Sequence, residues 1–195
     1  MYILSFDIGI KNLAYCYFSF DKINDVIQIK DWDVLDVSCI DKSNQSKVLL
    51  EKLNYHFSNI EIDYVVIENQ PALKNPIMKT IQVMVHTFFQ YQKYIIDRSI
   101  CVHIINARNK IKHSEKLLKS YNCDEIECKT SPSNKYRWNK EASILYTLQY
   151  LEYKDLQDHL TFFKKFKKKD DLADTLLQGL YFCHLPTTHE PIQSL

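Results

Sequence analysis

The stretch YVVIENQPALKNPIMKTIQVMVHTFFQYQKYIIDRSICVHII, residues 64–105, contains the pattern that decides the fold. It begins with a short continuous apolar run, residues 65–67, which is typical of a central strand covered on both faces. Pro71 stops this strand, and residues 75–96 then have apolar side chains at helical spacing. Residues 100–105 form a second short apolar run. The stretch therefore predicts a strand, a helix and a second strand parallel to the first.

The helix expected within residues 75–96 has a clear start and an apolar face. Asn75 is a favourable N-cap, and Pro76 suits the first helical position. Apolar side chains at helical spacing predict one face, formed by Ile77, Ile81, Met84, Phe88, Tyr91 and Ile95. This is more apolar surface than one sheet face needs. We expect most of it to be core, and the remainder is a candidate dimer interface.

Before this unit, the chain predicts three antiparallel strands. The first is apolar and ends at Asp7, and a turn follows in which Gly9 is free to take a positive φ. A polar hairpin turn separates the second strand from the third, which alternates apolar and polar residues. The strands are expected at residues 2–6, 13–20 and 26–37, and a helix is expected at residues 47–57.

After residue 105, the sequence predicts a polar, basic segment and then helices. Residues 106–138 have little apolar periodicity, so we expect a long loop or a partly helical insertion. Helices are expected at residues 139–152, 155–166 and 170–185, the last one capped by Asp170. The element order is that of a ribonuclease H-like α/β fold. Such a fold has a five-stranded mixed sheet in the order 3-2-1-4-5 with helices on both faces, and we expect one domain over residues 1–195.

Acidic residues stand at the ends of two strands that this fold makes neighbours. Asp7 ends the first strand and Glu68 ends the fourth, and both strands run in the same direction, so their carboxylates are expected side by side. Asp171 and Asp174 are three residues apart and share one face of the last helix. The opposite side of that helix carries leucines that would press on the sheet, and Gly179 would allow a close approach.

Converging carboxylates repel one another, and without a metal some would stay protonated through a raised pKa. Divalent cations remove this problem, and Mg²⁺ prefers hard oxygen ligands. Two such ions about 4 Å apart can hold a phosphodiester between them, one activating water and the other stabilising the leaving oxygen. The acids therefore predict metal-dependent phosphodiester hydrolysis.

Three segments resemble the RuvC-like Holliday junction resolvases: LSFDIGIKNLAY (4–15), VVIENQPALKNPIMKTIQ (65–82) and KKDDLADTLLQGL (168–180). The likeness is greatest to the poxvirus-type resolvases of large cytoplasmic DNA viruses, and the fungal mitochondrial cruciform-cutting endonucleases are also similar. The resemblance covers residues 1–105 and 139–184. The segment between them has no counterpart that can be aligned with the bacterial enzymes.

This resemblance implies both an activity and a set of site residues. The protein would act as a homodimer that resolves four-way DNA junctions by paired symmetric nicks, with Mg²⁺ or Mn²⁺ as cofactor and two ions per active site. It would process recombination intermediates and branched or concatemeric viral replication intermediates in the host cell cytoplasm, with the mitochondrion as the alternative location. The implied catalytic and metal-binding acids are Asp7, Glu68, Asp171 and Asp174.

Junction DNA carries dense phosphate charge, so its contact surface should be basic. Lys11 and Asn12 follow the first acid, as in the viral resolvases. Three basic clusters flank the predicted active-site segments, and Tyr136 and Trp138 lie within one of them as candidates for stacking on bases. The expected DNA-binding residues are Lys11, Asn12, Arg108, Lys110, Lys112, Lys135, Arg137, Lys140, Lys168 and Lys169.

The bulk composition limits the alternatives. Apolar residues make up 46% of the 195 residues, charged residues 25%, and the net charge is +1, as in ordinary globular domains. No apolar stretch reaches the roughly 20 residues that span a bilayer, so we expect an intracellular protein with no membrane partner. We expect the cysteines to be reduced thiols rather than zinc ligands.

Three other functions compete with junction resolution. A ribonuclease H acting on RNA–DNA hybrids remains open, because the acids do not select the substrate. A junction-binding module that does not cut is less favoured, because such a binder gains only repulsion from acids near phosphate. An actin-like ATPase would need a second domain and a glycine-rich loop, and this chain has two glycines, so we expect no nucleotide cofactor.

Overall fold

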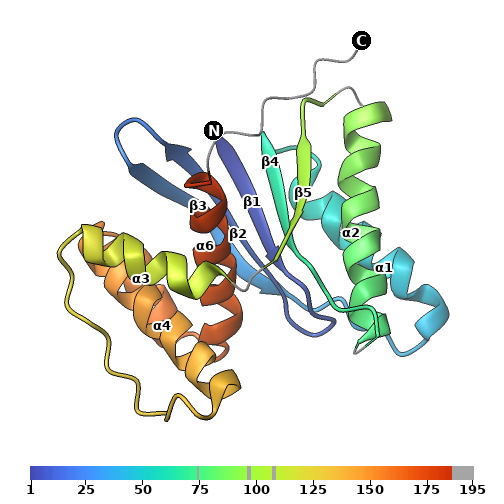
Figure 1. Cartoon of the computed structure of the whole chain (residues 1–195). Coiled ribbons are helices and arrows are strands. Elements are labelled where there is room, and N and C mark those ends of the chain that lie inside the picture. The colour runs from blue at the N-terminus through green and yellow to red at the C-terminus, as the bar shows by residue number, and fades with distance from the viewer. Residues whose placement is uncertain (74, 96–97, 107–108, 186–195) are drawn as a thin grey trace.

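The structure, a computed structural model, describes residues 1–73, 75–95, 98–106 and 109–185 (Figure 1). A five-stranded sheet lies at its centre with helices packed on both faces. In chain order the elements are β1 (Tyr2–Asp7), β2 (Leu13–Asp21), β3 (Val26–Leu35), a 3-10 turn (Lys42–Asn44), α1 (Gln45–Phe57), β4 (Tyr64–Glu68), α2 (Pro76–Ile95), β5 (Cys101–Ile105), α3 (Lys110–Ser120), α4 (Lys135–Tyr153), α5 (Gln157–Lys165) and α6 (Lys169–Cys183).

The strand order β3-β2-β1-β4-β5 confirms the predicted topology. The strands β1, β2 and β3 form an antiparallel meander, while β4 pairs in parallel with both β1 and β5. The parallel pairing of β4 with β5 is possible because α2 carries the chain back along the sheet before β5 begins. The fold is ribonuclease H-like, with the carboxyl ends of β1 and β4 next to each other.

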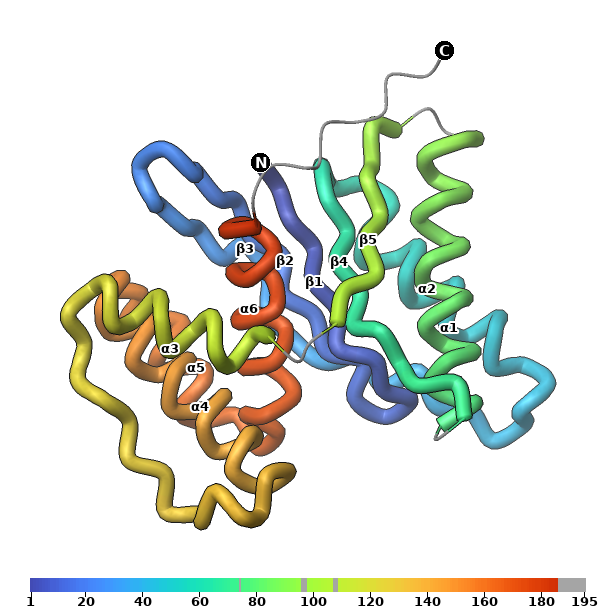
Figure 2. Tube along the Cα trace, in the orientation of Figure 1, coloured from blue at the N-terminus to red at the C-terminus, as the bar shows by residue number. Residues whose placement is uncertain are grey.

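Alternating side chains of the central strands build two separate cores. Leu4 and Phe6 of β1 face α1 and α2, whereas Ile3 of the same strand faces the layer that contains α6. In the second layer α6 lies directly on β1 and β2, and α3 and α4 pack on the far side of α6 (Figure 2). Helix α6 is therefore buried between the sheet and two other helices.

Helix α2 starts where the sequence predicts, and it buries part of the predicted apolar face. The Asn75 side chain accepts a hydrogen bond from the backbone N–H of Met78 (3.3 Å), which confirms the predicted cap. The predicted apolar stripe is partly wrong, because Ile77, Tyr91 and Ile95 are 52%, 56% and 64% exposed. The buried apolar residues of α2 are Ile81, Val85, Phe88 and Phe89.

The basic segment after β5 is more helical than its composition indicates. It contains α3, and α4 begins at Lys135 rather than at the expected residue 139. The earlier start has a local cause, because the Asn134 side chain caps α4 by accepting from the backbone N–H of Arg137. Helix α6 begins at Lys169, so Asp170 lies in its first turn and the prediction that it caps the helix is wrong.

None of the helices within the described residues has both the length and the apolar character needed to cross a membrane. All six cysteines are free thiols.

Candidate active site

Asp7 and Glu68 lie side by side at the carboxyl edge of the sheet. Phe6 of β1 is opposite Ile67 of β4, so the next residue on each strand, the acid, falls at the same level. The carboxyl group of Asp7 interacts directly with that of Glu68. The predicted juxtaposition of the first two acids is therefore confirmed.

The close packing of α6 on the sheet brings the C-terminal aspartates to this edge. Leu172, Leu176 and Leu180 are fully buried against the sheet, as predicted. A Cβ at Gly179 would lie 2.6 Å from the ring of Phe18, so the absence of a side chain there allows the close approach. Any larger residue would move α6 away from β1 and β2.

Gln178 fixes the position of α6 relative to the two strands that carry acids. Its buried side-chain amide donates to the backbone carbonyl of Phe6 (3.0 Å) and to the hydroxyl of Ser5 (3.2 Å) on β1. The same nitrogen lies 3.4 Å from the carbonyl of Val66 on β4. Asp174 is one helical turn before Gln178, so these contacts direct it towards Asp7 and Glu68.

Lys110 occupies the centre of the acid cluster. Its ammonium group forms an ion pair with Asp174 (Nζ–Oδ2, 2.9 Å), and its side chain is only 8% exposed. The hydroxyl of Ser143 on α4 donates to the other oxygen of Asp174 (2.8 Å). The sequence predicts Lys110 as a surface contact for DNA, whereas the structure places it inside the protein, among the acids.

The pKa values agree with a crowded cluster of acids around one cation. Burial raises the pKa of Asp7, the neighbouring charges of Glu68 and Asp174 raise it further, and Lys110 opposes them. Burial by itself would lower the pKa of Lys110, but the charges of Asp174, Glu68 and Asp7 outweigh it and raise the pKa. Lys110 therefore remains charged and neutralises part of the cluster.

Asp171 stands on the wall of a hollow beside this cluster. The hollow has a volume of about 380 Å³ and is lined by the turn after β1 together with Asp7, Met78 and Asp171. Burial raises the pKa of Asp171, and the charge of Asp170 raises it further. Asp170 is itself paired with Lys140 of α4. Asp7 and Asp171 thus border the same solvent-filled space.

Gly9 lies in the turn that lines this hollow. The expectation of a positive φ is wrong, because the backbone of Gly9 is not in the left-handed region. Glycine is required for space, since a Cβ at this position would overlap the backbone carbonyl of Asn12. The tight turn keeps the backbone close to Asp7.

The donor set fits a hard divalent cation in its chemistry. Carboxylates from Asp7, Glu68 and Asp174 supply the oxygen ligands that such a cation prefers. The spacing is not that of a bound ion: within residues 1–73, 75–95, 98–106 and 109–185, no three His, Cys, Asp or Glu side chains are arranged around a common metal position. Lys110 occupies part of the space between the acids.

The other predicted DNA-binding residues differ in how accessible they are. Lys140 and Lys169 are partly buried. Lys140 forms an ion pair with Asp170, and Lys169 donates a hydrogen bond to the backbone carbonyl of Phe166 (2.8 Å). Asn12 is partly buried, and Arg108 lies outside the described residues. The exposed members of the predicted set are Lys11, Lys112, Lys135, Arg137 and Lys168.

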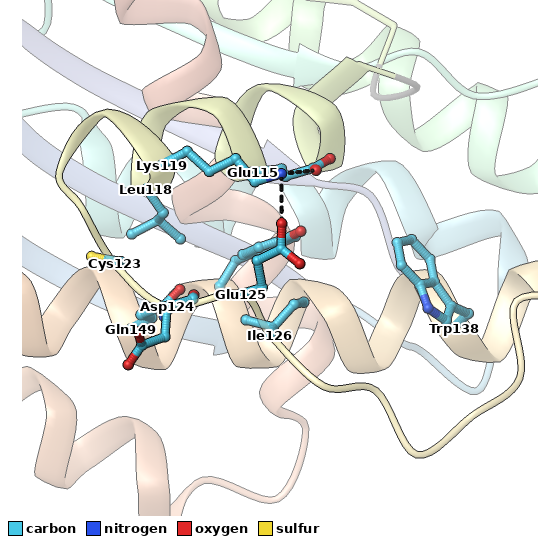
Figure 3. Close-up of a pocket in the computed structure, with 10 residues that line it drawn as sticks. Glu115, Leu118, Lys119, Cys123, Asp124, Glu125, Ile126, Trp138 and Gln149 are labelled. Atoms are coloured by element: carbon cyan, nitrogen blue, oxygen red, sulfur yellow. Dashed lines mark hydrogen bonds and ion pairs between the residues drawn. The ribbon is translucent and has the colours of Figure 1, made fainter.

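The two aromatic residues of the basic segment have different environments. Tyr136 is 70% exposed and lies beneath the Lys140 ammonium, 5.2 Å from the ring centroid. Trp138 lines a cavity of about 180 Å³ between α3 and α4 (Figure 3). In the same cavity Lys119 pairs with Glu115 (2.9 Å) and Glu125 (3.0 Å), so its charge is already compensated. Base stacking by Tyr136 and Trp138 stays a prediction.

Three functional positions are not apparent from the sequence. Gln178 and Ser143 are buried polar residues whose partners lie on other elements, and no local pattern indicates those partners. Lys110 is one lysine among several in a basic segment. The one sequence signal for Lys110 is its place shortly after β5, the strand next to the one that carries Glu68.

A ribonuclease H-like sheet with acids on β1, β4 and α6 defines the class of RuvC-like proteins. Residues 3–70 match the protein-family model described as mitochondrial resolvase Ydc2 / RNA splicing MRS1. This match covers about a third of the chain, so the chain resembles the resolvase family in its N-terminal part.

One curated protein and several solved structures are similar to this chain. The uncharacterized protein L451 of Acanthamoeba polyphaga mimivirus is 36% identical over 68% of this chain, and the chain spans only 32% of that protein's length. The crystal structure of fowlpox virus resolvase with substrate Holliday junction DNA aligns with a TM-score of 0.57 and 21% identity, covering 94% of this chain and 97% of that one. The yeast mitochondrial Holliday junction resolvase Ydc2 aligns with a TM-score of 0.61 and 16% identity, covering 93% and 78%. At these identities the solved structures establish the shared fold.

Proposed function

We propose that this protein is a divalent-cation-dependent endonuclease that resolves four-way DNA junctions by paired symmetric nicks. The observation that carries the proposal is the meeting of Asp7, Glu68 and Asp174 at one sheet edge, around the buried Lys110. The match of residues 3–70 to a resolvase family model supports four-way junctions as the substrate. A fowlpox relative of the same fold was crystallised with Holliday junction DNA.

In this proposal the acids of the cluster would hold Mg²⁺ or Mn²⁺, with Asp171 on the wall of the adjacent hollow. The bound cation would supply charge neutralisation at the phosphate and a more acidic water. A bound cation would favour the charged form of Asp7, whose pKa is raised by burial and by the charge of Glu68. Lys110 keeps the cluster compact by pairing with Asp174. The exposed lysines around the hollow would hold the phosphate backbone of the junction.

A substrate comparison tests the activity. The protein is incubated with a synthetic four-way junction, a plain duplex and an RNA–DNA hybrid of equal length, each with Mg²⁺ or with EDTA. We expect Mg²⁺-dependent paired nicks in the junction alone. Equal cutting of duplex and junction would contradict the proposal, and preferred cutting of the hybrid would assign a ribonuclease H. Tight junction binding without nicks would assign a binding module.

An acid variant tests the site. Asp174→Asn should reduce nicking at least about a hundredfold, because a bound metal contributes several kcal/mol to transition-state stabilisation. Junction binding should persist, since the substitution removes a negative charge near phosphate. Asp158→Asn, an exposed acid in the first turn of α5, is the matched control and should leave nicking unchanged. Wild-type turnover by Asp174→Asn would show that α6 is assigned incorrectly.

We further infer that the protein acts as a homodimer through the exposed apolar side of α2. A groove of about 700 Å³ between α1 and α2 is lined by Leu50, Val83, Met84, Phe88 and Tyr91, and its surface is mostly apolar. Apolar surface of this kind on a helix is typical of an interaction site. A two-fold dimer would direct two identical sites at opposed strands of a symmetric junction.

The dimer is tested by substituting within the groove. Val83 is 50% exposed, so Val83→Lys should leave the fold intact and shift the protein from dimer to monomer in sedimentation velocity. Paired nicking should then become single-strand nicking. Ile23→Lys, at a 93% exposed hairpin position, is the control and should stay dimeric. A wild-type protein that sediments as a monomer at micromolar concentration would contradict this inference.

The proposed biological setting is the processing of recombination intermediates and of branched or concatemeric viral replication intermediates in the host cell cytoplasm. The 36% identity to a mimivirus protein supports a viral setting. The family match to a mitochondrial resolvase keeps the mitochondrion as the alternative. Imaging a tagged full-length protein in infected cells distinguishes the two, because mitochondrial staining would exclude the cytoplasmic setting.

A further inference from the structure

Asp174 is held on both of its carboxylate oxygens by residues from two other helices. Lys110 at the start of α3 contacts Oδ2 (2.9 Å), and Ser143 on α4 donates its hydroxyl to Oδ1 (2.8 Å). The Ser143 side chain is buried, with the residue 1% exposed, whereas the Asp174 side chain keeps 24% of its surface accessible. One oxygen edge of Asp174 is therefore fixed from within the protein while the carboxylate still reaches solvent.

We propose that Ser143 is a positioning residue that orients Asp174 as a metal ligand. This inference rests on the proposed function. An ion pair to one oxygen leaves the carboxylate free to rotate about its last torsion, since that torsion is broad. A second hydrogen bond to the other oxygen restricts that rotation. Groups that orient a ligand in this way typically contribute 10-fold to 100-fold in metal affinity or activity.

The contact is unusual for a serine within a helix. Such a hydroxyl commonly bonds to a carbonyl of its own preceding turn, as Ser114 of α3 does to Lys110 (2.8 Å). Ser143 instead reaches across to α6. One turn earlier on α4, Lys140 pairs with Asp170 at the start of α6. Two successive turns of α4 therefore contact the acidic start of α6, one at Asp170 and the other at Asp174.

Thr147 provides a matched comparison on the same helix. It lies one turn after Ser143, is fully buried, and its hydroxyl has no hydrogen-bond partner. Removing this hydroxyl with Thr147→Val preserves volume and touches no acid. A general effect of losing a buried hydroxyl from α4 would appear in both variants, whereas a positioning effect appears only at Ser143.

The test compares Ser143→Ala, Ser143→Thr and Thr147→Val with the wild type. Mn²⁺ binding is measured by electron paramagnetic resonance without DNA, nicking is measured at saturating junction, and folding is monitored by urea unfolding. We expect Ser143→Ala to weaken Mn²⁺ binding and slow nicking 10-fold to 100-fold, with unchanged junction affinity. Ser143→Thr should recover most of both, and Thr147→Val should match the wild type.

The outcomes separate this inference from the proposed function. Wild-type Mn²⁺ affinity and nicking in Ser143→Ala would overturn the positioning role and leave the nuclease standing. Equal losses in Ser143→Ala and Thr147→Val, or a folded Ser143→Thr protein as defective as Ser143→Ala, would also overturn it. A wild type that binds Mn²⁺ in a Ser143-dependent way but never nicks would overturn the proposed function alone.

Discussion

The two faces of the sheet are held by different kinds of contact. On the face covered by α1 and α2, aromatic rings dominate, with Phe6 packed against Phe57 (5.4 Å between centroids) and Phe89 (5.8 Å). The α6 face also has an apolar core that contains Leu172, Leu176 and Leu180, but here polar side chains connect helix and sheet as well. Gln178 donates to β1, and the indole of Trp32 on β3 donates to the carbonyl of Leu172 (3.1 Å).

This difference corresponds to the location of the chemistry. Apolar contacts are non-directional and tolerate small shifts of a helix along a sheet. Hydrogen bonds require defined distances and angles, so they fix the register of α6 relative to β1 and β4. The acid cluster needs that register, because Asp174 must meet Asp7 and Glu68. The α1 and α2 face should therefore govern stability, and the α6 face should govern activity.

The largest expected effect is a loss of stability on the apolar face. Leu53 of α1 is fully buried in the core against the sheet. Leu53→Ala should lower the free energy of unfolding by about 2–5 kcal/mol, through lost burial and a cavity. Urea unfolding measures this change. Nicking per folded molecule should stay near the wild-type value, and a large loss of nicking at retained stability would remove the distinction between the faces.

Gln178→Leu should have the opposite profile. It removes the amide that joins α6 to β1 and β4, and leaving buried partners unsatisfied costs about 1–3 kcal/mol. We expect nicking to fall more than tenfold, because Asp174 loses its register with the strand acids. The control is Gln92→Leu on α2, a buried glutamine whose carbonyl oxygen has no partner. Comparable nicking in both variants would argue against register control by Gln178.

Gly179→Ala tests how closely α6 must approach the sheet. The added methyl group would lie 2.6 Å from the buried ring of Phe18, and such overpacking typically costs about 1–3 kcal/mol. Displacement of the helix should also weaken Mn²⁺ binding. Unfolding and Mn²⁺ titration measure the two effects. If α6 is not held close to the sheet, the variant will be as stable as the wild type or more so, given the higher helix propensity of alanine.

The smallest expected effect is a change in the pH dependence of stability, in the layer formed by α3 and α6. Burial lowers the pKa of His113 to about 4, and the neighbouring His184 and Lys116 act in the same direction. A lowered histidine pKa means that the unfolded chain takes up the proton first, so stability falls as pH drops from 6.5 to 4. His113→Leu should reduce the slope of the free energy of unfolding with pH across this range. An unchanged slope would contradict the assignment.

Much of the fold could be predicted because its signals are local. The Val65 to Ile67 run, the Asn75 cap and the alternation in β3 each reflect neighbouring residues in the chain. The juxtaposition of Asp7 with Glu68 followed once the strand order was known, because parallel neighbours end at the same edge. The close approach at Gly179 also followed, since its neighbours are leucines at helical spacing.

The predictions that were wrong depend on which neighbours an element meets. The apolar stripe of α2 was only partly right, because the sequence contains more apolar residues than the sheet covers. Ile81 is buried, whereas Ile77 and Tyr91 remain exposed. Helix α3 starts beside the acids and buries Lys110, a position that the composition of the basic segment does not indicate, and its contact with DNA stays a prediction. Periodicity does not distinguish a solvated lysine from one that neutralises a cluster.

The sequence by itself determined the strands, most of the helices and the positions of the four acids along them, because these depend on side chains close together in the chain. The tertiary structure alone decided that Lys110 enters the acid cluster, that Ser143 holds Asp174 and that Gln178 sets the register of α6. Each of these contacts joins elements that are distant in sequence. Their geometry follows from how helices pack on the sheet and on one another, and that packing minimises free energy over the whole molecule.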